Sequence, residues 1–366
     1  MIKTLIPAAK PLIGRAERKA VDRVLRSGMI AQGPEVAAFE QEFGDHFVTG
    51  RACVAVNSGT AGQHLGQLAA GVGPGDEVIV PSFTFAATGN SVALTGATPV
   101  FVDIEPDTYG LDPAAVAAAI TSKTKAIMPV HLYGHPARMV ELEDLAREHD
   151  LEIFEDAAQA HGASLDGRPV GTWGRFAMFS LYPTKNMTSG EGGMVACDSP
   201  ELVRAVKLLR NQGQEIQYHN EVIGFNARMT DIHAAIGRVQ LTRVAGWTAT
   251  RQQNAAHLSA GITAVPTPVI APGAVHVFHQ YTVRVTDDRD GFVKALRDEH
   301  GVGSGVYYPV PNHRLPSLAA YAPGLDLPET EKAAREVVSL PVHPSLTRRD
   351  LDRIVAAVNA VAAAGA

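Results

Sequence analysis

The feature that most constrains the fold is an alternation of short apolar runs with helix-like segments between residues 50 and 200. The runs are rich in Val, Ile and Phe, and they are Glu77–Val80, Pro99–Asp103, Ala126–Val130, Glu152–Glu155, Ala177–Leu181 and Met194–Cys197. Their apolar residues are mostly continuous rather than alternating with polar ones, which is typical of strands covered on both faces. Strand–helix alternation at this spacing predicts an α/β fold with a mostly parallel, doubly wound sheet.

Two of the intervening helices have readable first residues. Asp112–Pro113 and Ser199–Pro200 each place a capping side chain directly before a proline. An Asp or Ser accepts a hydrogen bond from the first helical turn, and a proline there loses no N–H that the helix needs. We therefore expect helices over Ala114–Ile120 and Glu201–Arg210.

The last third of the chain has a different character. A chain of 366 residues exceeds the ~250–300 residues at which one apolar core stops growing. The expected elements after residue 245 are a helix at Trp247–Leu258, a linker at Val265–Gly273, a strand at Gln280–Val285, a helix at Asp290–Glu299, a strand at Gly305–Tyr308 and a helix at Arg348–Ala363. We predict a large domain over residues 1–245 and a smaller C-terminal α+β domain over 246–366, to which the N-terminal segment could also contribute.

Composition and charge exclude two classes of partner. The net charge of −6 and the lack of a basic segment argue against nucleic acid. No run approaches the ~18 apolar residues of a membrane span, and the start, MIKTLIPAAKPLIGR, lacks the pattern of a signal peptide. We therefore expect a cytoplasmic protein without membrane attachment.

The cysteines and closely spaced histidines do not predict a metal site. Cys53 and Cys197 each lie in an apolar, strand-like run, so we expect buried structural thiols. His131 and His135 have the i, i+4 spacing of helical metal ligands, but the glycine and proline that flank His135 preclude a continuous helix.

Four separated segments carry residues that could act together at one edge of the sheet. Asn57–Thr60 lies where a helix is expected to begin, and its backbone N–H groups and two hydroxyls suit a phosphate. Asp156 and Lys185 each follow a predicted strand, at the edge where open α/β sheets bind ligands. Phe85 follows another strand and could cover a planar ligand. Each residue alone also has a structural interpretation: a helix cap for Ser58 and Asp156, a solvated cation for Lys185, and core packing for the phenylalanine.

Together these parts are the ones needed to hold pyridoxal 5'-phosphate. The lysine forms a Schiff base with the aldehyde of the cofactor. The carboxylate pairs with the pyridine nitrogen and keeps it protonated, so that the ring acts as an electron sink. A charge-assisted hydrogen bond of this kind contributes roughly 1.5–3 kcal/mol. We therefore predict a pyridoxal phosphate enzyme with Lys185 and Asp156 at its centre.

At these residues the sequence resembles the DegT/DnrJ/EryC1/StrS family of sugar aminotransferases, within the fold-type I class of pyridoxal phosphate enzymes. The resemblance covers nearly the whole chain. The motifs that carry it occur in the family's order, and they are NSGTAG, PSFTFAAT, PVFVDIEPDTY, EDAAQAHGA, FSLYPTKNMTSGEGGM and GFNARMTDIHAAIGRVQL.

The resemblance implies a role for each matching residue. Lys185 would bond to the cofactor and then move a proton during catalysis, and Asp156 would hold the pyridine nitrogen. The other implied cofactor contacts are Phe85 and Gln159 at the ring and Gly59, Thr60 and Ser180 at the phosphate, joined by Asn226 from the neighbouring subunit of a homodimer. His313 would line the sugar site.

The implied reaction is amino transfer from L-glutamate to a keto group of a nucleotide-linked sugar. Members that replace the lysine with histidine carry out deoxygenation, so the lysine at 185 favours transamination. The run Gly190–Met194 (GEGGM) resembles members that act at C4 of 4-keto-6-deoxy sugars, because the C3 group tends toward GDGG. The alternatives are amination at C3 or of a cyclitol ketone, another pyridoxal phosphate reaction, and a regulatory protein with an inert cofactor pocket.

Overall fold

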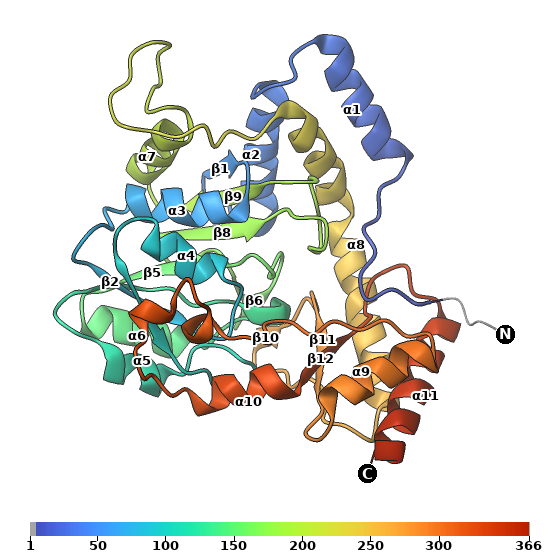
Figure 1. Cartoon of the computed structure of the whole chain (residues 1–366). Helices are drawn as coiled ribbons and strands as arrows, with labels where there is room; N and C mark the ends of the chain where they lie inside the picture. Colours follow the sequence, from blue (N-terminus) through green and yellow to red (C-terminus); the bar gives the residue numbers. More distant parts are fainter. Residues whose placement is uncertain (1–4, 366) are drawn as a thin grey trace.

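The computed structural model describes residues 5–365 and is built around a seven-stranded sheet (Figure 1). The strands follow the order β1-β9-β8-β5-β4-β2-β3. Their bounds are β1 Cys53–Val56, β2 Glu77–Pro81, β3 Thr98–Val102, β4 Thr124–Ile127, β5 Glu152–Asp156, β8 Phe176–Ser180 and β9 Gly193–Cys197. The neighbours β3, β2, β4, β5 and β8 pair in parallel in this order across the sheet, and β9 runs antiparallel to β1 and β8. The predicted α/β class with a mostly parallel sheet is confirmed.

Helices cover both faces of this sheet, and further helices pack beside the strands of a smaller C-terminal part (Figure 1). The helices are α1 Arg15–Ser27, α2 Pro34–Phe47, α3 Gly59–Ala69, α4 Ala87–Ala93, α5 Pro113–Ala119, α6 Met139–Glu148, α7 Pro200–Arg210, α8 Asp231–Gly261, α9 Arg289–Asp298, α10 Pro328–Glu336 and α11 Arg348–Gly365. The remaining strands are β6 Ser164–Leu165, β7 Arg168–Pro169, β10 Ala274–Val275, β11 Tyr281–Arg284 and β12 Val337–Leu340.

The strands are apolar throughout because two cores meet on them. In β1, Cys53 and Ala55 join the core that contains Phe39 of α2. Val54 and Val56 join a second core on the opposite face, which includes Leu65 of α3. Successive side chains of a strand point to opposite faces, so a sheet between two helical layers needs an apolar residue at nearly every position.

The predicted helix starts are present as capped N-termini. The Asp112 carboxylate accepts a hydrogen bond from the N–H of Ala114 at 3.0 Å, and the Ser199 hydroxyl accepts one from Leu202 at 3.4 Å. Ser58 caps α3 in the same way, through the N–H of Ala61 at 3.1 Å.

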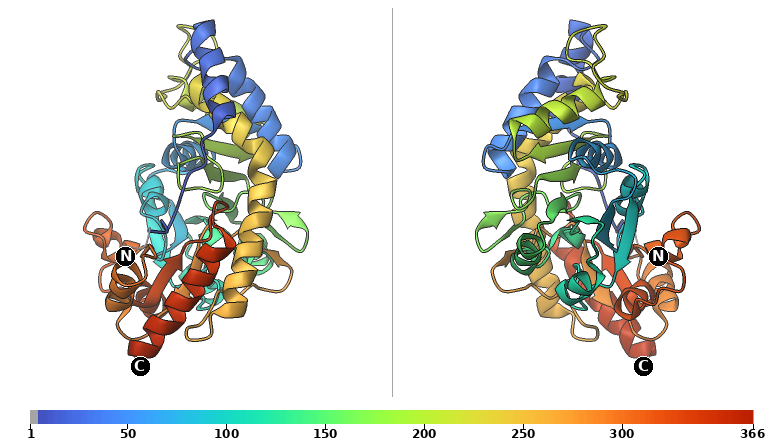
Figure 2. Two further views of the ribbon diagram at one scale, coloured as in Figure 1. Left: turned by 90° about the vertical axis from the view of Figure 1, so that its right-hand side faces the viewer. Right: turned by 90° about the vertical axis from the view of Figure 1, so that its left-hand side faces the viewer.

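A single long helix, α8, connects the two parts of the molecule. It has 31 residues, and one end packs on α1 and α2 while the other end packs on α11 (Figure 2). The predicted division at residue 245 falls inside this helix, and the helix predicted over Trp247–Leu258 lies in its C-terminal half. Ile6 belongs to the C-terminal core with Tyr281 and Ile354. The domain division itself stays a prediction.

One predicted strand is wrong. Gly305–Tyr308 forms only an isolated bridge, between Gly305 and Ser339. Tyr308 has a φ of 59°, in the left-handed region that an extended strand does not allow. The partner of β11 is instead β12, which the sequence interpretation did not identify.

Within residues 5–365, we find no helix with both the length and the apolar character that crossing a membrane requires.

Candidate active site

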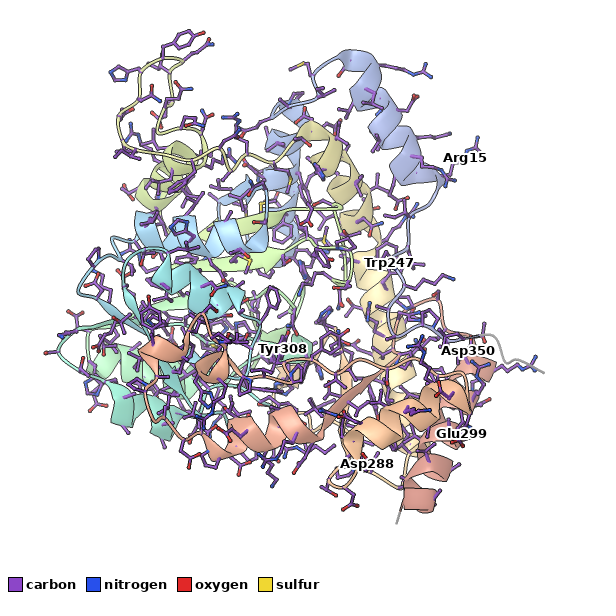
Figure 3. The ribbon with its side chains drawn as sticks, in the orientation of Figure 1. Arg15, Trp247, Asp288, Glu299, Tyr308 and Asp350 are labelled. Atoms are coloured by element: carbon purple, nitrogen blue, oxygen red, sulfur yellow. The ribbon has the colours of Figure 1, made fainter. Side chains whose placement is uncertain are left out.

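A cavity of about 290 Å³ lies where β5 and β8 end, beside the first turn of α3. Its wall contains seven of the nine residues predicted to bind cofactor or substrate, which are Gly59, Thr60, Phe85, Asp156, Gln159, Ser180 and Lys185. Tyr307 and Tyr308 contribute to the wall from the C-terminal part of the chain. Tyr308 lies near the centre of the molecule (Figure 3). Sequence segments that are 100 or more residues apart therefore meet in one site.

Asp156 is the last residue of β5 and is 5% exposed. Its Oδ2 accepts hydrogen bonds from Gln63 Nε2 at 2.5 Å and from Thr88 Oγ1 at 2.8 Å. Its Oδ1 accepts one from the backbone N–H of Ala158 at 3.1 Å. Three donors on one carboxylate stabilise its ionised form in a buried place where an unpaired charge would be unfavourable.

Lys185 is half-buried in the turn that follows β8. Its backbone N–H donates to the carbonyl of Tyr182 at 3.0 Å, which fixes the turn. Burial lowers the pKa of the Lys185 amine to about 8, while the nearby charge of Asp156 acts in the opposite direction. The amine is therefore neutral in a substantial fraction of molecules near physiological pH, as a nucleophile or a proton acceptor must be.

The first turn of α3 provides backbone donors at the other end of the cavity. Gly59 and Thr60 begin the helix, and Ser180 ends the adjacent strand β8. A Cβ at position 59 would lie 3.0 Å from the sulfur of Met178 and 3.2 Å from the Ser180 Cβ, so only glycine fits there without displacing its neighbours. The unpaired N–H groups of a helix N-terminus attract anions.

Phe85 and Gln159 occupy the wall in different ways. The Phe85 side chain is 61% exposed, although it is large and aromatic. Gln159 is buried, and its amide accepts a hydrogen bond from the N–H of Tyr133 at 2.7 Å and donates one to the hydroxyl of Tyr308 at 2.8 Å. An aromatic ring left uncovered in the wall of this cavity is available to stack on a planar ligand.

Two predicted site residues do not line the cavity. Asn226 is exposed, and its carbonyl accepts from Asn57 Nδ2 at 3.5 Å. His313 is 2% exposed; its ring pairs with the Ser82 hydroxyl at 2.7 Å and with a carboxylate oxygen of Glu331 at 3.2 Å. Their predicted roles remain predictions, and the role of His313 has no support from its position.

The histidines with metal-ligand spacing serve structural purposes. His131 contacts a carboxylate oxygen of Glu155 at 3.2 Å and accepts from the N–H of Ala137 at 3.0 Å. His135 contacts the carbonyl of Pro136 at 2.7 Å and accepts from the N–H of Ala271 at 3.0 Å. In the part of the chain that the structure describes, we find no group of three or more His, Cys, Asp and Glu that could hold a metal ion.

Nearly the whole sequence matches one known family. Residues 11–359 match the model of the DegT/DnrJ/EryC1/StrS aminotransferase family. The chain belongs to this family. The predicted enzyme class, a pyridoxal phosphate-dependent aminotransferase, is confirmed by this match and by named transaminases among the relatives.

Relatives and solved structures of the family match this chain over nearly its full length. The dTDP-3-amino-3,4,6-trideoxy-alpha-D-glucose transaminase of Streptomyces venezuelae is 44% identical over 350 residues, covering 94% of this chain and 92% of the relative. GDP-perosamine synthase of Caulobacter vibrioides is 41% identical over 371 residues, covering 97% and 98%. The structure of S. venezuelae DesV with a ketimine intermediate superposes with a TM-score of 0.92 and 42% identity, covering 98% of this chain and 99% of that one. The structure of NtdA of Bacillus subtilis with bound pyridoxamine phosphate superposes with a TM-score of 0.91 and 31% identity, covering 99% of this chain and 86% of that one.

The cavity of this DegT/DnrJ/EryC1/StrS aminotransferase has the chemistry that pyridoxal phosphate requires. A buried, triply hydrogen-bonded carboxylate (Asp156) suits a protonated ring nitrogen, and an amine with a lowered pKa (Lys185) suits an aldehyde. The N-terminus of α3 beside Ser180 suits a phosphate. The residues present therefore fit the cofactor that the family uses.

Several residues at the site were not identified from the sequence. Gln63 and Thr88 donate to Asp156, and Glu191 and His279 line the cavity. Burial lowers the pKa of His279 well below its usual range, so its imidazole is neutral. None of these residues carries a local sequence signal, except that Glu191 lies in the GEGGM run.

Proposed function

We propose that this enzyme transfers an amino group from L-glutamate to the keto group of a nucleotide-linked deoxysugar. The observation that carries the proposal is the meeting of Lys185 and Asp156, from the ends of adjacent strands, in one cavity. Family membership supports amino transfer, and the relatives named above are named for dTDP- and GDP-linked sugars. A sugar linked to a nucleoside diphosphate is therefore the best-supported acceptor class.

Bound pyridoxal phosphate supplies an aldehyde that bonds to amines and a ring that accepts electrons from a carbon losing its proton. In our proposal Asp156 holds the ring nitrogen through its carboxylate, which the three donors keep ionised. Phe85 covers one face of the ring, and Gln159 lies at the other face or near the ring hydroxyl. Gly59, Thr60 and Ser180 bind the phosphate.

Lys185 has two duties in this proposal. It holds the cofactor covalently when no substrate is bound, and its freed Nζ then moves a proton at the substrate carbon that carries the amino group. A pKa of about 8 suits both duties, because the amine can take up and release a proton near neutral pH. L-Glutamate would give up its amino group to the cofactor and leave as 2-oxoglutarate, and the ketosugar would then receive that amino group in a ping-pong scheme.

We further propose that the enzyme is a homodimer in which Asn226 of the partner subunit completes the phosphate site. Asn226 of the same chain is exposed and does not line the cavity, which is the arrangement that a donation to a neighbouring copy requires. In the segment that precedes Asn226, Tyr218 and Ile223 are 89% and 92% exposed. Large apolar side chains that gather on one exposed segment mark an interaction surface.

For the position of amination we propose C4 of a 4-keto-6-deoxy sugar. Glu191, the acidic residue of the GEGGM run, lines the cavity, so the residue that differs between the two motif types borders the proposed substrate site. Amination at C3 is the second candidate, because the relative at 44% identity is named for a 3-amino sugar.

The test is a half-reaction followed by a substrate panel. Glutamate should convert the cofactor absorbance of the purified enzyme to the pyridoxamine form, and the original spectrum should return on addition of the correct ketosugar. The panel contains dTDP- and GDP-linked 4-keto-6-deoxy sugars and their 3-keto isomers, with the aminated carbon assigned by NMR. Turnover of the 3-keto isomers alone would overturn the C4 proposal. No spectral change with glutamate would favour a regulatory protein with an inert pocket.

A further inference from the structure

Two glutamines, Gln63 and Gln67, lie one turn apart on a buried face of α3. Their side chains are 1% and 0% exposed. Gln67 Nε2 donates to the hydroxyl of Ser91 in α4 at 2.9 Å and to the backbone carbonyl of Gln63 at 3.2 Å. Gln63 Nε2 donates instead to the carboxylate of Asp156 at 2.5 Å. Two residues of the same type and burial therefore differ in whether they touch the site.

The glycines of α3 explain how Gln63 reaches this carboxylate. Gly62 and Gly66 face the sheet, and a Cβ on them would lie 2.9 Å from Met178 and 2.6 Å from the ring of Phe176. Side chains larger than glycine would push α3 away from β8. The close approach of helix and sheet brings the amide of Gln63 within hydrogen-bonding distance of the end of β5.

The hydrogen bonds of the Gln63 amide show which end must face Asp156. An ionised carboxylate only accepts hydrogen bonds, so the amide must present Nε2 to it. Gln63 Oε1 is then buried without a hydrogen-bond partner. Oε1 of Gln67 is buried and unpaired in the same way, so the hydrogen bond to Asp156 is what distinguishes Gln63 from Gln67.

The geometry points to Gln63 as a positioning residue that, with Thr88, orients the Asp156 carboxylate toward its cofactor partner. The inference rests on the role of Asp156 in the proposed function. Both residues donate to the same oxygen, Oδ2, which leaves Oδ1 with a single backbone donor. Two side-chain donors on one oxygen fix the orientation of the carboxylate, so loss of one donor should let the Asp156 side chain turn away from its cofactor partner.

The experiment measures the pyridoxal phosphate dissociation constant of the apoenzyme between pH 5.5 and 8. Gln63→Met keeps the length of the side chain and removes the donor, and Gln67→Met is the matched control from the next turn. The other charged or titratable groups near the carboxylate, Lys185 and Tyr308, are the same in all variants, as is the phosphate of the cofactor. A difference in affinity between the variants therefore reports on the contact between Gln63 and Asp156.

We expect Gln63→Met to bind pyridoxal phosphate roughly tenfold more weakly than wild type across this pH range, because a hydrogen bond to the Asp156 carboxylate is lost. The pyridoxal phosphate dissociation constant of Gln67→Met should stay within about twofold of the wild-type value. A profile for Gln63→Met that matches the Gln67→Met profile would overturn the inference. If Gln63→Met does not fold by circular dichroism, Thr88→Val removes the second donor, and wild-type affinity in that variant overturns the inference equally.

Asp156→Asn separates this inference from the proposed function. If Asp156→Asn binds pyridoxal phosphate with wild-type affinity and pH dependence, the proposed role of Asp156 fails. If Asp156→Asn weakens binding while Gln63→Met follows wild type, only the role of Gln63 fails.

Discussion

The lowered pKa of Lys185 makes a quantitative prediction about cofactor uptake by the apoenzyme. Burial lowers this pKa from 10.5 to about 8, although the Asp156 charge acts against the shift. Only the neutral amine bonds to an aldehyde. At pH 7 about one Lys185 amine in ten is neutral, compared with about one in 3,000 for an unperturbed lysine. The second-order rate constant for uptake at this pH should thus be about 300-fold higher than for a lysine of equal intrinsic reactivity in water.

Stopped-flow mixing of apoenzyme with excess pyridoxal phosphate measures this rate constant through the change in cofactor absorbance. The rate constant should rise close to tenfold per unit below about pH 7 and about fivefold between pH 7 and 8, and it should level off above a pH of about 8 as most of the amine becomes neutral. In Asp156→Asn the charge that raises the pKa of Lys185 is absent, so the break should move to lower pH.

The matched control is a free lysine derivative, whose rate constant should keep rising up to about pH 10. An enzyme profile that also rises without a break to pH 10 would refute the reasoning, because it would mean that Lys185 titrates as a solvated amine.

Three other perturbations test separate parts of the argument. Lys185→Ala should abolish turnover and the absorbance of bound cofactor, because no other lysine lines the cavity in residues 5–365; amino transfer near the wild-type rate would contradict the assignment. Gly66→Ala should lower the free energy of unfolding by about 1–3 kcal/mol, because its Cβ would overlap an aromatic ring of β8, and thermal melting measures the loss. Arg210→Met should cost about 3–5 kcal/mol in urea unfolding, because it leaves the largely buried Glu40 carboxylate without its cation, and Glu40→Leu in the same chain should recover most of it. Sedimentation of active enzyme as monomers alone would remove the role given to Asn226 of the partner subunit.

The central sheet could be predicted from sequence because burial on both faces leaves a local signal. Each predicted run overlaps a strand of the sheet, since a strand between two helical layers must be apolar at almost every position. The length of α8 could not be predicted in this way, because its sequence lacks a regular apolar pattern. Its buried face includes the polar residues Gln240, Arg251 and Asn254, which a count of apolar periodicity assigns to the surface.

The two central site residues could be predicted for a topological reason. Parallel neighbouring strands end at the same edge, so residues that follow β5 and β8 meet even though Asp156 and Lys185 are far apart in sequence. The contact between Gln63 and Asp156 depends instead on how closely a helix approaches the sheet, which is set by packing between distant segments. The predicted contact from Asn226 needs a second copy of the chain.

The site has to satisfy opposite demands on two groups that share one cavity. Burial favours the neutral form of both Lys185 and Asp156, but the proposed chemistry needs a neutral amine and an ionised carboxylate. The hydrogen bonds resolve this conflict, because all three donors reach the carboxylate while the amine retains its lowered pKa. Local hydrogen bonding therefore distinguishes the acid from the base in one buried cavity. On this argument the donors from α3 and α4 are as much a part of the site as the carboxylate that they hold.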